Sequence, residues 1–201
     1  MSNASSYVDV AQDITGGSSY DDALPRASKL LIGPNILGAN WTPEQVWNTG
    51  FVDQHKENLA ALSVEQYVPF LSPSNHPVHL RPSSYASTNC FAFTGTGLNI
   101  SAQDAFPTFL NHTAATSQVA PYLNSAQIAQ DAGKPLLMME TNSAACGGFP
   151  GLSDSFGEAL WSLDYGLQMA YSNFSGAMFH VFGQNSSFNV STLFIHFTDS
   201  C

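Results

Sequence analysis

Four short apolar runs, separated by segments with helical spacing, dominate the pattern of this chain. They lie near residues 29–33, 62–67, 135–140 and 176–182. Uninterrupted apolar runs of this length are typical of strands buried on both faces of a parallel sheet. Strands that alternate with helices predict parallel βαβ units joined by right-handed crossovers. The pattern therefore predicts an α/β fold.

Helix signals lie between these runs. Thr42-Pro43-Glu44-Gln45 predicts a helix start, with Thr as N-cap, Pro in the first turn and Gln three residues beyond the cap. We expect Gly50 to end this short helix and a second helix to follow over Phe51–Ala61. Residues 102–132 predict helix interrupted at Pro107 and Pro121.

Gly133 is expected to cap the helix that precedes the third strand. A last helix is predicted between the third strand and the fourth. Ser155-Phe156-Gly157-Glu158 predicts a capping box, and the helix behind it should run to about Asn173. Its apolar residues at helical spacing are Phe156, Leu160, Leu163, Leu167 and Ala170. We expect these residues to form the apolar face of an amphipathic helix.

The organisation of the chain follows from these elements. Residues 1–28 are polar and turn-rich, residues 29–188 hold the strands and helices, and residues 189–201 form an atypical tail. Residues 70–101 predict a long lid or binding loop. A complete eight-fold (β/α)8 TIM barrel usually needs about 250 residues. We therefore expect about half of one.

The net charge of the chain excludes two classes of binding partner. The formal net charge is −10, which argues against nucleic acid and anionic membrane surfaces. No apolar run approaches the roughly 18 residues that span a bilayer. Seven Asn-x-Ser/Thr triplets occur, which favours a secreted, glycosylated parent. Because the first residues show no export signal, we expect this chain to lack the start of that parent. The oligomeric state stays open.

Three cysteines allow one disulfide. We predict Cys90 with Cys146, and the alternative is a free buried thiol. His76 and His79 with Cys90 have a passing likeness to metal ligands, but the intervening Pro77 disfavours the helix that such a site needs. Residues 151–155 lack the second glycine of a serine-hydrolase elbow. We therefore expect no metal, no cofactor and no serine nucleophile.

Glu140 is the first candidate for chemistry. It is a lone carboxylate at the carboxyl end of the third apolar run, and small polar residues follow it. Barrel enzymes carry their catalytic groups at this end of the strands. The alternative is an ordinary strand that ends in a solvated glutamate.

Several segments resemble the second half of the barrel in glycoside hydrolase family 79, the fungal β-glucuronidase and heparanase-like group. The resemblance rests on Lys29–Pro34, on Val64-Glu65-Gln66-Tyr67 and above all on residues 134–184, which include Glu140-Thr141-Asn142-Ser143 and Cys146-Gly147-Gly148-Phe149. It covers roughly two-thirds of the chain. It implies a retaining glycosidase, with strands 5 to 8 of the barrel in this chain.

The resemblance also implies roles for particular residues. Glu140 fits the position of the nucleophile, and Tyr67 fits that of a tyrosine whose hydroxyl lies beside the nucleophile. The alternative for Tyr67 is a half-buried strand residue whose hydroxyl is hydrated. The loop residues and the end of the last strand are implied to bind the sugar: Cys146, Gly147, Gly148, His180 and Gln184. The alternatives are a tight turn for the glycines and a core histidine for His180. The partner implied is a glucuronide-type carbohydrate.

The chain departs from the family in two places. Gln66 stands where the family usually has a histidine before the tyrosine. The Asn-Glu-Pro motif of the catalytic acid is absent from the sequence. We expect no other glutamate to replace that acid, because Glu44 and Glu57 fall on predicted helices, Glu158 opens one, and Glu65 points along a different strand.

Two hypotheses follow. The first is a glycosidase of the retaining β-glucuronidase type that is incomplete or inactive because its general acid is missing, so that its status as an enzyme is open. The second is a non-catalytic carbohydrate-binding or interaction protein derived from a glycosidase barrel. Binding without turnover would separate the second from the first.

Overall fold

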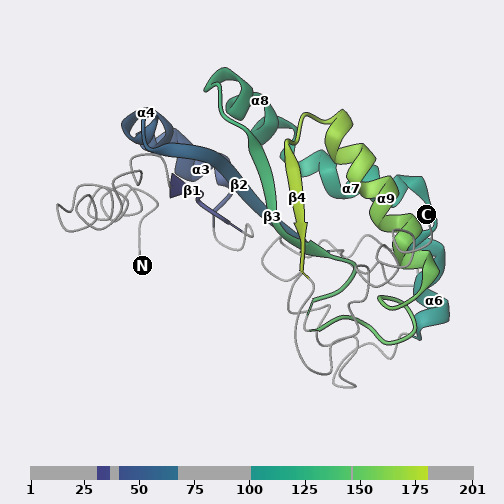
Figure 1. Cartoon of the computed structure of the whole chain (residues 1–201). Coiled ribbons are helices and arrows are strands. Elements are labelled where there is room, and N and C mark those ends of the chain that lie inside the picture. Colours follow the sequence, from purple (N-terminus) through teal and green to yellow (C-terminus); the bar gives the residue numbers. More distant parts are fainter. Residues whose placement is uncertain (1–30, 37–40, 68–100, 146, 181–201) are drawn as a thin grey trace, which may run out of the picture.

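The computed structural model describes residues 31–36, 41–67, 101–145 and 147–180. Within these ranges, four strands form one parallel sheet in the order β1-β2-β3-β4 (Figure 1). Their bounds are β1 (Leu31–Ile32), β2 (Leu59–Tyr67), β3 (Leu136–Asn142) and β4 (Gly176–Phe179). All four predicted strands are confirmed, and the parallel pairing confirms the α/β class.

Helices connect consecutive strands. Between β1 and β2 lie α3 (Pro43–Val46), a π-helical turn (Trp47–Phe51) and α4 (Val52–His55). Between β2 and β3 lie α6 (Ala102–Phe109), α7 (His112–Val119), a 3₁₀ turn (Ala120–Tyr122) and α8 (Leu123–Asp131). The helix α9 (Phe156–Tyr171) joins β3 to β4 and packs beside α7 and β4 (Figure 1). Among the helices that the structure describes, none has the length and apolar character needed to cross a membrane.

The core lies between one face of the sheet and these helices. Leu62 and Val64 of β2 and Leu136 and Met138 of β3 are buried in a single cluster with helix side chains. Because side chains alternate along a strand, the residues between them turn to the opposite face. That opposite face is where the candidate site is found.

Local signals set most helix ends as predicted. Thr42 accepts from the Gln45 N–H while the Gln45 side chain accepts from the Thr42 N–H, so the first capping box is confirmed. Gly133 has φ of +65°, a left-handed conformation that glycine adopts without strain. The helix α9 ends at Tyr171, close to the predicted end.

Two predicted helix boundaries are wrong. The α-helix expected over Phe51–Ala61 is shorter, because α4 ends at His55. Glu57 therefore lies in a turn and not on a helix. The strand β2 already begins at Leu59, which pairs with Leu31. Pro107 does not interrupt α6. The chain breaks after Phe109 instead, where the Asn111 side chain caps the next helix.

The predicted apolar face of α9 is also wrong. Phe156, Leu163 and Leu167 are 66%, 57% and 63% exposed, and Leu160 is exposed as well. The buried face carries Trp161, Tyr165 and Met169 with Glu158 and Ser162. Trp161 stacks on Tyr165 at a centroid distance of 5.1 Å and meets Phe109 edge-on at 5.6 Å. Aromatic packing against the sheet and α6 therefore selects the face that is buried.

Candidate functional site

Four polar side chains come together where the parallel strands end. Glu65 lies in β2, Glu140 in β3, and His180 directly after β4. Asn35 follows β1, and its neighbour Ile36 bridges to Val64, which holds this segment beside β2. The carboxyl ends of parallel strands share one edge of a sheet, so four distant segments contribute to one site.

A register shift places the two glutamate residues opposite each other in the sheet. Val64 pairs with Met138, whereas Glu65 pairs with Glu140, so Met139 is an extra residue in β3. Such bulges re-aim side chains and are frequent next to active sites. Beyond the bulge, the Thr141 hydroxyl contacts the Tyr165 hydroxyl of α9 at 3.4 Å. Glu140, as the preceding residue, therefore turns away from the helices.

The Glu65 carboxyl is held in an environment that favours its neutral form. Its Oε2 accepts a hydrogen bond of 3.0 Å from the Asn35 side-chain amide. Partial burial, and secondarily the charge of Glu140, raise the pKa of Glu65 from 4.5 to about 7. The Tyr122 hydroxyl fixes this part of β2 through bonds to the Glu65 carbonyl at 2.9 Å and to the Gln66 side chain at 2.8 Å.

His180 faces Glu140 across the strand ends. Its Nδ1 lies 3.4 Å from the Glu140 Oε1, and the two side chains are 43% and 37% exposed. The backbone holds His180 in place, because its N–H donates to the Thr141 carbonyl at 2.8 Å and its carbonyl accepts from the buried Asn142 amide at 2.7 Å. His180 is thus exposed at the site rather than a core residue.

The loop after β3 is built from buried hydroxyls and glycines. Ser143 and Ser153 contact each other at 2.9 Å, and Ser153 also accepts from the Phe149 N–H at 2.8 Å. Gly147 and Gly148 have φ of +90° and +88°, which explains glycine at both positions. The Gly148 N–H donates to the Ala145 carbonyl, as in a tight turn.

The remaining predicted residues are only partly placed. Tyr67 pairs through its backbone with Asn142 at the end of β2, and its side chain lies outside the described part. Cys146, Gln184, Cys90, His76 and His79 also lie outside it, and with them the predicted disulfide and the predicted long loop. Within the described ranges, no group of three or more His, Cys, Asp or Glu side chains is arranged to hold a metal ion.

Sequence reasoning missed Glu65 and Asn35. Glu65 lies on a different strand from Glu140, as predicted, and the sheet register pairs the two residues. The period of two along a strand could have found it, because residues 65 and 67 fall on the same face. Asn35 gave no such signal, because its place depends on the bridge between Ile36 and Val64.

A third carboxyl group, that of Glu158, is buried behind the loop. Glu158 is 1% exposed, and neither of its side-chain oxygens has a hydrogen-bond partner of good geometry among the described residues. Burial raises its pKa to about 8, against a smaller lowering by the nearby Ser143 hydroxyl. The predicted capping box is therefore half formed: Ser155 accepts from the Glu158 N–H, but the Glu158 side chain turns inward.

We expect Glu158→Gln to raise the free energy of unfolding at pH 8 by roughly 4 kcal/mol and to change it little at pH 4, since each pKa unit corresponds to about 1.4 kcal/mol. Folded Glu158 keeps its proton up to about pH 8, whereas the unfolded chain loses it near 4.5. The folded state therefore loses stability as the pH rises between these values. Urea unfolding at both pH values checks this.

The control for this experiment is Glu57→Gln, which removes an exposed carboxylate. Its effect on unfolding should be small at both pH values. Equal effects of Glu158→Gln at pH 4 and pH 8 would contradict the assignment of a buried, protonated carboxyl.

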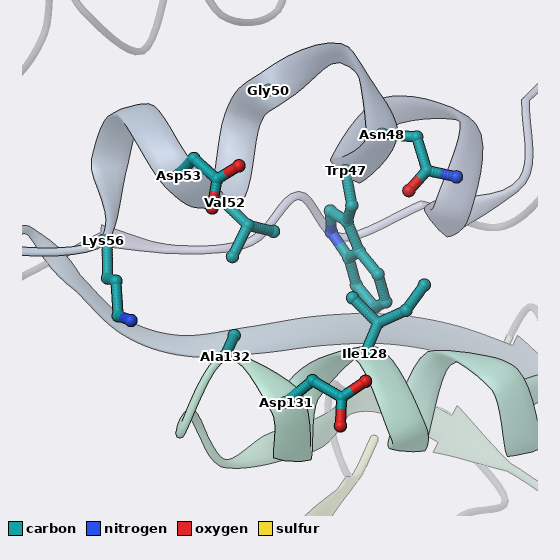
Figure 2. A pocket seen from close by; sticks show the side chains of 9 residues that line it. All are labelled: Trp47, Asn48, Gly50, Val52, Asp53, Lys56, Ile128, Asp131 and Ala132. Carbon is teal, nitrogen blue, oxygen red and sulfur yellow. The ribbon is translucent and has the colours of Figure 1, made fainter.

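A pocket of about 360 Å³ lies away from the strand ends. Figure 2 shows it between the segment that carries Trp47, Val52 and Asp53 and the helix α8 that carries Ile128 and Asp131. Its lining contains none of the four site residues. We place no chemistry in it.

Comparisons with known proteins point to one group of enzymes. No protein-family profile matches the sequence. The chain is 38% identical over 86 residues to a β-glucuronidase of Aspergillus niger, a region that covers 41% of this chain and 15% of the relative. It is 35% identical over 77 residues to a β-glucuronidase of Neurospora crassa, covering 37% and 14%. Part of this chain is β-glucuronidase-like.

A solved glucuronidase structure shares part of its fold with this chain. A 4-O-α-L-rhamnosyl-β-D-glucuronidase from Fusarium oxysporum superposes with a TM-score of 0.54 at 19% sequence identity. The match covers 86% of this chain and 31% of the solved one. This chain therefore spans less than a third of that structure, and its curated fungal relatives extend far beyond the matched region.

Proposed function

We propose that this chain carries the nucleophile-bearing part of a retaining β-glucuronidase of glycoside hydrolase family 79, with Glu140 as the nucleophile. The observation that carries the proposal is the position of Glu140 at the carboxyl edge of a parallel sheet, beside Glu65 and 3.4 Å from His180. The four strands would be strands 5 to 8 of a (β/α)8 barrel. A secreted, glycosylated parent belongs to the same proposal.

The geometry supports a specific division of roles. In the retaining mechanism an ionised carboxylate attacks the anomeric carbon, the bond to the leaving oxygen breaks, and a glycosyl ester forms. Glu140 is partly exposed and turned away from the core, so it can reach a sugar. His180 can donate to the Glu140 carboxylate and orient it. Tyr67 remains our candidate for a second donor, and Gly147, Gly148, Cys146 and Gln184 for sugar contacts.

The general acid is the missing part in this proposal. The sequence has no Asn-Glu-Pro motif. A positioned acid typically contributes 10²- to 10⁴-fold to such a step. We therefore expect little turnover of glucuronides with poor leaving groups, because the departing oxygen would receive no proton from a positioned side chain.

The test uses a substrate that needs no acid. The reagent is the dinitrophenyl glycoside of 2-deoxy-2-fluoro-β-glucuronic acid. Its dinitrophenolate leaving group departs unprotonated, and the sugar should remain as a glycosyl ester on Glu140. Mass spectrometry of the intact chain and of its peptides will locate the added mass. The corresponding glucoside serves as the control for the sugar carboxylate. An unlabelled chain, or label on another residue, would refute the assignment of Glu140.

A carbohydrate-binding protein without turnover is the second candidate. The absence of the Asn-Glu-Pro motif favours it. Saturable binding of methyl β-glucuronide, measured by calorimetry, together with no covalent labelling would support this candidate over the first.

A further inference from the structure

Within the described ranges, the side chains of the candidate site are acidic, although the proposed ligand is an anion. Glu65 and Glu140 are direct neighbours in the sheet, and Asn35 contributes only a neutral amide. The Lys56 side chain lines the pocket remote from the strand ends, and the Lys134 ammonium donates to the Leu59 carbonyl at the start of β2. Neither of the two described lysines is therefore shown at the site, whereas His180 lies against Glu140.

Two ionised carboxylates in this arrangement would repel the carboxylate of a uronic acid. Like charges a few ångströms apart near a protein surface repel each other, because water screens them less there than in bulk solution. A protonated carboxyl group has the opposite effect, because it is a hydrogen-bond donor to an anion. The protonation state of one of the two glutamates thus decides whether the site accepts an anionic sugar.

The contacts distinguish the two glutamates. Glu140 faces His180, a partner suited to an ionised carboxylate. Glu65 accepts from Asn35 through Oε2 and has no cationic side chain placed against it in the described ranges. A proton on Glu65 would therefore sit on Oε1, the oxygen that does not accept from Asn35.

We propose that Glu65 serves as a neutral, hydrogen-bond-donating carboxyl group that allows this acidic site to bind the carboxylate of a glucuronide. The inference rests on the proposed function. It makes Glu65 a residue that determines specificity, distinct from the nucleophile and from the missing general acid. Binding is then coupled to the proton on Glu65.

The sign of the pH dependence follows from this coupling. Burial, reinforced by the charge of Glu140, raises the pKa of Glu65 to about 7, so the neutral form prevails below this value and the charged form above it. If only the neutral form binds, the affinity falls about tenfold between pH 6 and pH 8, in proportion to the competent fraction. Among the residues that the structure describes, the other titratable groups facing this region are Glu140, His180 and the Tyr122 hydroxyl, whose raised pKa keeps it protonated throughout.

The experiment is an NMR titration of the full chain with methyl β-glucuronide and with methyl β-glucoside at pH 6, 7 and 8. We expect glucuronide binding to weaken about tenfold across this range and glucoside binding to stay constant. Glu65→Gln keeps an N–H donor that does not titrate, so it should bind glucuronide equally at all three pH values. Glu57→Gln, on the surface, should retain the slope of the wild type.

The outcomes separate this inference from the proposed function. The pH dependence of glucuronide affinity could persist in Glu65→Gln and disappear in His180→Gln. That result would overturn the role of Glu65 and assign the titrating group to His180. Glucuronide binding by the wild-type chain that is independent of pH would overturn the inference alone. No glucuronide binding at any pH would overturn both. In a ¹³C titration, the Glu65 carboxyl should have its midpoint near pH 7, shifted down in Glu140→Gln.

Discussion

Replacement of Glu140 by glutamine will slow formation of the glycosyl ester by at least roughly 10³-fold, because the neutral amide cannot serve as the attacking carboxylate. The change is nearly isosteric, and the side chain is 37% exposed, so the fold should be retained. The measurement is the rate of mass increase with the activated 2-fluoroglucuronide. Binding of the unreacted sugar should persist, since the site keeps its other polar groups.

Two variants make this result interpretable. His180→Gln removes the group 3.4 Å from the Glu140 carboxylate and should slow labelling less than the loss of Glu140 itself. Glu57→Gln removes a surface carboxylate and should leave the rate unchanged. Labelling of Glu140→Gln at the wild-type rate would place the nucleophile elsewhere, with Glu65 as the first residue to inspect.

Trp161→Ala will lower the free energy of unfolding by about 3–5 kcal/mol, the range typical of a buried tryptophan truncated in a core. The indole is 1% exposed, and its ring lies against Tyr165, Phe109 and Phe179. Its N–H donates to the Gln118 side chain at 3.3 Å, so truncation also leaves a buried amide oxygen without this donor. Urea unfolding followed by circular dichroism measures the loss.

Leu167→Ala on the same helix is the matched control. This leucine is 63% exposed on the opposite side of α9, and its truncation should cost less than about 1 kcal/mol. Similar losses for both variants would mean that the outer face of α9 is covered in solution. A larger loss for Leu167→Ala would reverse the assignment of the buried face.

The case of α9 explains why sequence alone found the helix but not its orientation. Two apolar stripes share the 3.6-residue period: one holds Phe156, Leu163 and Leu167, the other Trp161 and Tyr165. A helix that is apolar on both sides gives no local indication of which stripe is buried. The neighbours made the choice, because the rings of Phe109 and Phe179 fit against Trp161.

The candidate site was likewise predictable from the sequence only in part. The lone Glu140 at the end of an apolar run and the resemblance of its segment to glycosidases could be read from the sequence. The pairing of Glu65 with Glu140 could not, because it depends on one extra residue in β3, Met139, which shifts the register between two strands more than 60 residues apart in the chain. No local rule places that shift.

Local sequence is enough to predict the alternation of strands and helices, the caps at Thr42 and Gly133, and the carboxylate at the end of the third strand, since each depends on residues within a few positions of one another. The buried face of α9 and the side chains around Glu140 become known from the folded chain alone. Strand register and aromatic packing are set by segments distant in the sequence, and the contacts between these segments outweigh local preference.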